Sequence, residues 1–145
     1  MKKSTIMLVW GAVALLVLTC APLYAQTTKV IKVVRADIPF DFIIRDKSLP
    51  AGTYDAQPLN NSPILVVRDS ENRESIAVGT FTVEAANNHQ VKPMFVFRRY
   101  GNQYFLAQVW MGYSDTRGGE LPKSAKERQV AKTQPKPELI MVAAK

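Results

Sequence analysis

Residues 94–110 read MFVFRRYGNQYFLAQVW, and this aromatic-rich stretch decides the fold class. Two runs of strand-favouring residues flank Gly101-Asn102, a pair typical of a hairpin turn. The stretch therefore predicts two antiparallel strands. The expected cross-strand pairs are Tyr100 with Gln103, Arg99 with Tyr104, Phe97 with Leu106, Phe95 with Gln108, Arg98 with Phe105, Val96 with Ala107 and Met94 with Val109.

Neither face of this hairpin is consistently polar. A hairpin that is apolar on both sides should lie centrally in its sheet, with its second face covered by another layer, a loop or a second subunit. Its arginines, close to the tip, are expected to reach water. We expect the aromatic side chains to form core, and the alternative is a pocket or a protein interface. These side chains are Phe95, Phe97, Tyr100, Tyr104, Phe105 and Trp110.

Shorter strand patterns lie on both sides of the hairpin. Pro, Gly, Asn and Asp clusters separate them, as expected of turns. The predicted strands cover residues 30–34, 38–44 as one interrupted strand or two, 53–57, 64–67, 75–83 and a closing strand at 138–142.

A short helix is predicted to begin within residues 120–128 and to end before the segment 133–137, which contains two prolines. Ser124 and Glu127 have the spacing of a capping box. Gly118-Gly119, just before, is interpreted as a flexible turn. The expected fold is all-β, an antiparallel sandwich or small barrel of about seven to nine strands, with one short C-terminal helix before the closing strand.

The first 25 residues have the pattern of a secretory signal peptide. Met1-Lys2-Lys3 precedes the apolar run from Ile6 to Leu18, and Ala25 offers a small residue at the cut. We expect cleavage near Ala25, with cleavage after Ala21 as an alternative. Residues 26–145 would then form a single β domain that is secreted or periplasmic.

Two other readings of this segment are less well supported. The stretch from Thr5 to Ala21 only comes near the roughly 17 to 25 apolar residues that a spanning helix needs. Lipid anchoring at Cys20 is disfavoured because Thr19 precedes it, where a small residue such as Gly, Ala or Ser is usual. Cys20 is the chain's one cysteine, so its loss with the signal leaves no disulfide.

Four motifs together resemble a group of small, uncharacterised, secreted bacterial β-proteins. They are IPFDF at 38–42, LPAGTY at 49–54, RYGNQYFL at 99–106 and ELPKS at 120–124. The resemblance would extend over nearly all of the mature chain. It implies an exported or envelope protein and no established activity, so it provides no catalytic residue.

The residues offer no constellation that enzyme chemistry requires, and we expect no catalytic, cofactor-binding or metal site. His89, the one histidine, lies in an Asn-rich loop without a neighbouring motif. Carboxylates fall on strands or strand ends with no spacing that selects a pair. These are Asp41, Asp55, Asp69 and Glu84. Gly118-Gly119 lacks the Lys-Ser/Thr of a phosphate loop.

Basic residues give the one candidate binding surface. The full chain has 19 Lys and Arg against 12 Asp and Glu, so loss of Lys2 and Lys3 leaves 17 against 12. The candidate surface for a polyanion consists of Arg98, Arg99, Arg117, Lys123, Lys126 and Arg128, with Lys132 and Lys136 nearby. Such a surface can meet lipid phosphates or acidic polysaccharide, or it can simply keep the protein soluble.

The sequence therefore predicts an exported, non-enzymatic binding or structural interaction module of the bacterial envelope. The partner, an envelope polyanion, a lipid or a protein, is left open, as is the oligomeric state. Nucleic acid is disfavoured by the export signal. The first alternative is a small barrel that carries an apolar ligand. The second is an enzyme that acts on cell-wall sugar through two carboxylates.

Overall fold

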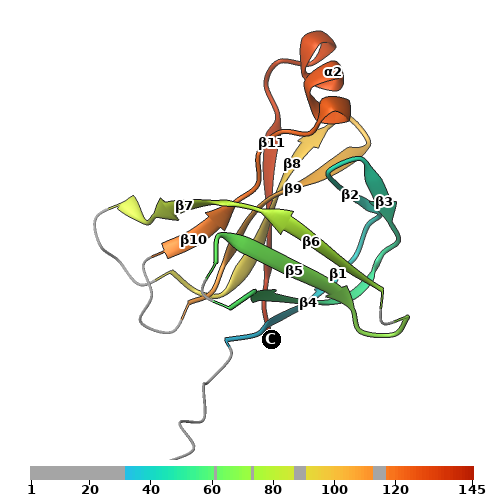
Figure 1. Ribbon diagram of the computed structural model, residues 1–145. Helices are drawn as coiled ribbons and strands as arrows, with labels where there is room; N and C mark the ends of the chain where they lie inside the picture. Colours follow the sequence, from blue (N-terminus) through green and yellow to red (C-terminus); the bar gives the residue numbers. More distant parts are fainter. Residues whose placement is uncertain (1–31, 61, 73, 87–90, 113–116) are drawn as a thin grey trace, which may run out of the picture. The chain divides into compact units, whose positions relative to one another are not determined.

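Two β-sheets share a core in the structure, which is a computed structural model (Figure 1). It describes residues 32–60, 62–72, 74–86, 91–112 and 117–145, which belong to one structural unit. The predicted signal peptide (1–25) and His89 lie outside the described residues.

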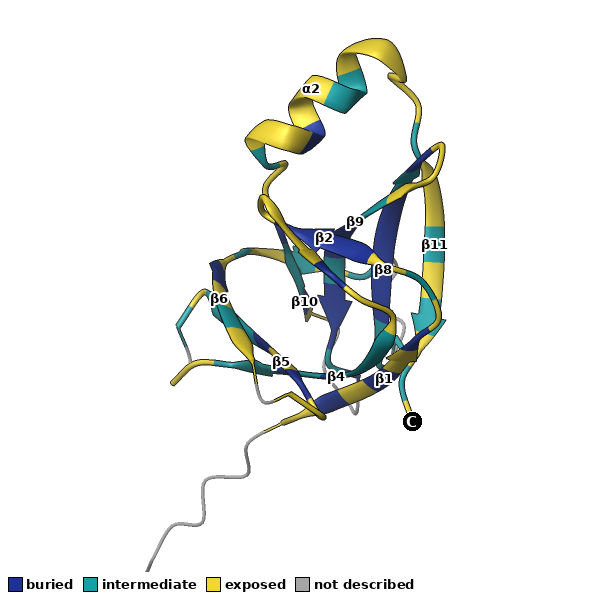
Figure 2. Cartoon of the chain, turned by 90° about the vertical axis from the view of Figure 1, so that its right-hand side faces the viewer, coloured by how far each residue is buried: buried dark blue, intermediate teal, exposed yellow. Residues whose placement is uncertain are grey.

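The first sheet is antiparallel and has the order β1-β4-β5-β6. Its strands are β1 (Val34–Ile38), β4 (Gly52–Pro58), β5 (Ile64–Asp69) and β6 (Ser75–Gly79). Along β1, Val34, Ala36 and Ile38 are buried while Arg35 and Asp37 are exposed. This alternation, visible in Figure 2, arises because successive side chains of a strand point to opposite faces.

The second sheet has the order β11-β8-β9-β10-β7. Its strands are β11 (Glu138–Ala143), β8 (Met94–Tyr100), β9 (Gln103–Trp110), β10 (Arg117–Glu120) and β7 (Phe81–Glu84). Beside β9 also lies β2 (Phe42–Ile44), which in turn pairs with β3 (Lys47–Leu49). Helix α2 (Ala125–Thr133) precedes β11.

The two sheets are connected on both sides without closing into a barrel. The predicted strand 75–83 is two strands, because the chain leaves the first sheet after β6 and enters the second as β7, with Thr80 between them. On the other side, the backbone N–H of Lys145 donates to the carbonyl oxygen of Arg35 at 2.9 Å. The arrangement is a sandwich-like all-β fold, with one short helix before the final strand, as predicted.

Eleven strands occur in the described residues, more than the sequence suggested. Besides the division at Thr80, the short strands β3 and β10 were not expected. Each lies beside a better-marked partner, β2 and β9 respectively, and has little strand character of its own. Their pairing is thus a consequence of tertiary context.

The hairpin β8–β9 is central in its sheet, as predicted, and its register is correct near the turn. From Tyr100 with Gln103 to Phe97 with Leu106, the observed pairs are the expected ones. Beyond them a bulge shifts the register by one residue, so that Val96 pairs with Gln108, Phe95 with Val109 and Met94 with Trp110. The extra residue is Ala107, whose carbonyl oxygen accepts from Leu121 N at 2.8 Å.

Gly118 and Gly119 form part of β10 and are not the flexible turn that the sequence suggested. A Cβ atom at Gly118 would lie 2.8 Å from Cδ2 of Trp110, so the indole rests directly on this glycine. The prediction of a turn was wrong because Gly118 supplies space for the neighbouring Trp110 ring within a strand.

Aromatic rings fill the space between the sheets. Phe97 meets Phe40 and Phe42 edge-to-face, with ring centroids 5.1 and 5.4 Å apart, and Phe42 meets Tyr54 at 4.8 Å. Of the six aromatic residues predicted as core, five are buried, and the sixth, Tyr104, is half-buried and stacks on Phe40. The prediction that these aromatic side chains form the core is therefore confirmed.

Replacing Phe97 by alanine should lower the free energy of unfolding by about 3 to 5 kcal/mol, because the ring is fully buried and the cavity left behind cannot close completely. Urea unfolding measures this change. Leu139→Ala is the control, since Leu139 is 58% exposed and its truncation should cost no more than about 0.5 kcal/mol. A loss below about 1 kcal/mol for Phe97→Ala would contradict its place in the core.

Candidate functional site

Helix α2 covers part of the outer face of the β8–β9 hairpin. Ile43, Tyr100 and Phe105 form a small buried cluster there, and Val130 and Ala131 of α2 pack against it. The sequence predicted that this second hairpin face would be covered by another layer, a loop or a subunit. For the half nearest the hairpin tip, the cover is this helix.

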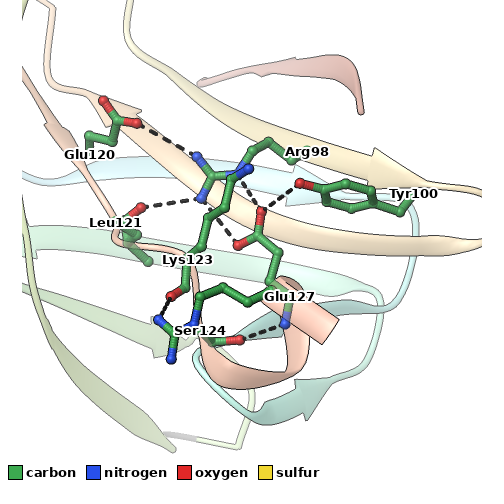
Figure 3. A network of polar contacts seen from close by, with 8 residues as sticks. Arg98, Tyr100, Glu120, Leu121, Lys123, Ser124 and Glu127 are labelled. Atoms are coloured by element: carbon green, nitrogen blue, oxygen red, sulfur yellow. Dashed lines mark hydrogen bonds and ion pairs between the residues drawn. The ribbon is translucent and has the colours of Figure 1, made fainter. Parts of the chain in front are cut away.

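A buried ion pair fixes the helix to the sheet (Figure 3). The guanidinium of Arg98 donates to the Glu127 carboxylate through Nε at 2.6 Å and through a second nitrogen at 3.2 Å. It also donates to the Leu121 carbonyl oxygen at 3.2 Å and lies 3.6 Å from Glu120 Oε1. Tyr100 donates its hydroxyl proton to Glu127 Oε1 at 3.2 Å. The exposed fractions are 10% for the Arg98 side chain and 2% for that of Glu127.

The first turn of α2 is capped from two sides, and the predicted capping box is only half formed. Ser124 Oγ accepts from the backbone N–H of Glu127 at 3.1 Å, as expected. The Glu127 carboxylate, however, binds Arg98 and Tyr100 instead of returning to the cap residue. Asp46, from the turn between β2 and β3, accepts from the Lys126 N–H at 3.1 Å. Tertiary pairing outcompetes the local bond of Glu127 because a buried guanidinium needs a counter-charge.

The outward side of the helix is basic. We call this region the α2 surface and define it by its exposed cations Lys123, Lys126, Arg128, Lys132 and Lys136. Glu127 is the one acid in residues 123–136, and its charge is neutralised by Arg98. The other exposed helix positions carry Ala, Gln and Thr, so this side presents no large apolar group.

Three arginines of the predicted polyanion surface lie elsewhere. Arg98 does not reach water as expected, because it is buried under α2. Arg99, at the hairpin tip, donates to Gly101 O at 2.8 Å, lies 3.3 Å from Glu138 and stands over the Tyr104 ring. Arg117 is exposed at the start of β10, where it pairs with Glu84 across the strands. The structure thus gathers Lys123, Lys126 and Arg128, together with Lys132 and Lys136, into one surface.

The Arg98–Glu127 pair was not predicted, although the sequence contains a signal for it. Glu127 precedes Val130 and Ala131 by three and four residues, which places all three on one face of a helix. An acid on an apolar helix face and an arginine on an apolar strand face each need a partner of opposite charge.

Three of the four carboxylates considered for catalysis form contacts that hold neighbouring backbone or side chains in place. Asp41 accepts from the Ala51 N–H at 2.9 Å. Asp69 accepts from Glu71 N at 2.8 Å and from the Asn72 side chain at 2.9 Å, and the Asn72 bond is the main cause of its lowered pKa. Asp55 holds Arg35 through two bonds of 2.6 and 2.8 Å, and this arginine likewise lowers the pKa of Asp55. Glu84 is exposed on β7. A general acid would instead need a raised pKa.

Metal sites and membrane-spanning helices are both absent from the part of the chain that the structure describes. No group of three or more His, Cys, Asp or Glu side chains there is arranged to hold a metal ion. No described helix is long and apolar enough to cross a membrane.

Removing one partner of the buried ion pair should destabilise the protein strongly. We expect Glu127→Gln to lower the free energy of unfolding by about 3 to 5 kcal/mol, because the Arg98 charge would remain buried without compensation. The double variant Arg98→Met/Glu127→Leu should recover most of that loss, since it removes both charges and keeps the volume. Urea unfolding of Arg98→Met, Glu127→Leu and the double variant gives the coupling energy. A single-variant loss under about 1 kcal/mol would show that the pair is not desolvated.

Three comparisons with known proteins found no relative of this chain. No protein-family model matches the chain. Searches of curated proteins and of solved structures find no match either. The resemblance to a group of secreted bacterial β-proteins therefore stays a prediction, and a function must be inferred from the residues of this chain alone.

Proposed function

We propose that this protein is an exported, non-enzymatic binding module that attaches to an anionic component of the bacterial envelope through the α2 surface. The observation that carries the proposal is the concentration of five exposed cations over residues 123–136, whose one acid is buried and paired. Closely spaced phosphate or carboxylate groups, on lipid headgroups or on an acidic polysaccharide, are the chemistry that such a surface attracts.

The way in which α2 is held supports this role. Glu127 ties the helix to Arg98, and Asp46 and Ser124 cap its first turn, so the cations are presented on an anchored element. Arg128 also donates to the Lys123 carbonyl oxygen at 2.9 Å, which restrains its side chain without neutralising it. Lower mobility of the cations reduces the entropy that binding would cost.

The composition of the exposed helix face indicates how attachment would occur. Val130 and Ala131 face the sheet, and the outward positions lack large apolar side chains that would insert into hydrocarbon. Attachment would therefore be electrostatic and peripheral, and it should weaken steeply with salt.

The same geometry gives less support to the two alternatives. An apolar carrier needs interior space, whereas Phe40, Phe42 and Phe97 pack edge-to-face between the sheets. A carboxylate enzyme needs a general acid with a raised pKa, and the pKa values of Asp55 and Asp69 are lowered by their hydrogen-bond partners.

Vesicle binding tests the proposal directly. Residues 26–145 should co-sediment with phosphatidylglycerol vesicles or be retained by immobilised polygalacturonate at low salt, and should be released near 1 M salt, where the screening length is about 3 Å. Lys126→Gln/Arg128→Gln/Lys132→Gln should lose about a hundredfold in vesicle affinity, at about 1 kcal/mol for each cation near an anionic surface. Which matrix binds identifies the source of the anionic groups.

A second triple variant with the same net charge as the first distinguishes binding at the α2 surface from attraction by the protein's overall charge. Lys32→Gln/Lys92→Gln/Arg117→Gln removes three exposed cations that lie outside the α2 surface. This variant should keep most of the affinity, and equal losses for the two triple variants would contradict a localised site. No salt-dependent binding to either matrix would overturn the proposal.

Export is tested by the mass of the chain recovered from a bacterial host. We expect the periplasm or the medium to contain a product that begins at Gln26. As a control, Leu15→Arg interrupts the apolar run and should leave the full-length chain in the cytoplasm. Full-length wild-type protein in the cytoplasm would contradict export, and a lipid-modified Cys20 at the new N-terminus would replace cleavage near Ala25 by lipid anchoring.

A further inference from the structure

A hollow of about 300 Å³ lies on the outer face of the first sheet, far along the sequence from α2. Its walls are Val33, Arg35, Asp55, Gln57, Val66 and Arg68. Strand pairing sets the polar residues in rows, since Arg35 is opposite Asp55, Asp55 is opposite Arg68, and Gln57 is opposite Val66. On the outer face of β1, β4 and β5, a row of three charged side chains therefore lies beside an amide and an apolar side chain.

The charge of this hollow is not balanced. Arg35 and Asp55 neutralise each other through a two-bond contact, and this contact raises the pKa of Arg35 as it lowers that of Asp55. Within the described chain, the guanidinium of Arg68 donates no hydrogen bond and acts on Asp55 through charge alone. The Arg68 guanidinium, with its positive charge and all its N–H donors, is thus available to a ligand beside the Arg35–Asp55 ion pair.

The remaining walls restrict what can accompany an anionic group. The Gln57 amide both donates and accepts hydrogen bonds, which suits hydroxyl groups. Val66 and the half-exposed Val33 offer small apolar patches against which C–H groups can lie. A volume of about 300 Å³ is at the lower end of the range for small-molecule sites, so the ligand must be small.

We propose that this hollow binds a small hydroxylated carboxylate of the sugar-acid class. The planar guanidinium of Arg68 would hold the carboxylate through two parallel hydrogen bonds, in the same geometry that Arg35 already forms with Asp55. Gln57 would meet a ring hydroxyl, and Val66 would contact the C–H face of the ring. The Arg35–Asp55 pair would keep the row of side chains in place.

This inference is independent of the α2 surface, because the two sites share no residue. An isolated sugar acid would occupy the hollow, whereas the α2 surface is suited to many anionic groups at once. The experiment therefore uses a monomeric ligand, for which the scattered cations of α2 have little affinity.

Amide chemical shifts, followed during titration of residues 26–145 with glucuronate, test the proposal. We expect saturable shifts at β1, β4 and β5 in the millimolar range, much weaker shifts with glucose, which lacks the carboxylate, and weaker shifts with acetate, which lacks the hydroxyls. Arg68→Gln should weaken glucuronate binding at least about tenfold, because a charged hydrogen-bonded contact is lost. Gln57→Leu should reduce the preference for glucuronate over acetate.

Arg128→Gln is the matched control, since it removes one exposed guanidinium from the α2 surface and should leave glucuronate binding unchanged. Arg68 and Gln57 lie on the outer face of the sheet, so their variants should fold, which the unchanged shifts of core amides would verify. Three results would overturn the proposal: shifts that map to α2, equal binding by Arg68→Gln, or inorganic phosphate that shifts the same amides as strongly as glucuronate. Loss of vesicle binding alone would overturn only the function proposed for α2.

Discussion

The structure depends on a hairpin that is apolar on both faces. One face of β8–β9 supplies Phe95, Phe97, Leu106 and Val109 to the core between the sheets. The other face carries Tyr100 and Phe105, which would be exposed without a second cover. The first sheet and α2 are therefore the two layers that burial of this hairpin requires.

The burial of the hairpin's second face also determines what the surface looks like. Because Glu127 must face Arg98, the rotation of α2 about its axis is fixed, and Lys126, Arg128 and Lys132 are directed to solvent. A buried ion pair is an expensive way to attach a helix when compared with apolar packing. Here it gives the helix one orientation, and this orientation places the cations together.

Prediction from the sequence succeeded where a segment's own pattern determines its structure. The aromatic hairpin, the closing strand and the short helix with Ser124 as its cap were all found in this way. Prediction failed where a residue distant in sequence determines the local structure. The bulge at Ala107 accommodates the bond from Leu121, Gly118 is needed beneath Trp110, and the carboxylate of Glu127 is drawn to Arg98.

The candidate sites were likewise predictable only where neighbouring residues in the sequence form them. Clustered charge in residues 123–136 is visible in the sequence, so the α2 surface was largely anticipated. Arg98 was wrongly included because neighbouring arginines on a strand face opposite sides, and only the fold shows which side is covered. The hollow was not anticipated at all, since its residues come from three strands and are separated by up to 35 positions.

The position of β11 has a consequence for biogenesis. This strand pairs with β8 along its whole length, and the residue that follows it bonds back to Arg35 at the beginning of the fold. A growing chain that lacks these residues leaves the side of β8 unpaired and the two sheet edges unconnected. Such a chain cannot complete its native topology until synthesis has passed β11, so the last residues to be made are also the ones that complete both sheets.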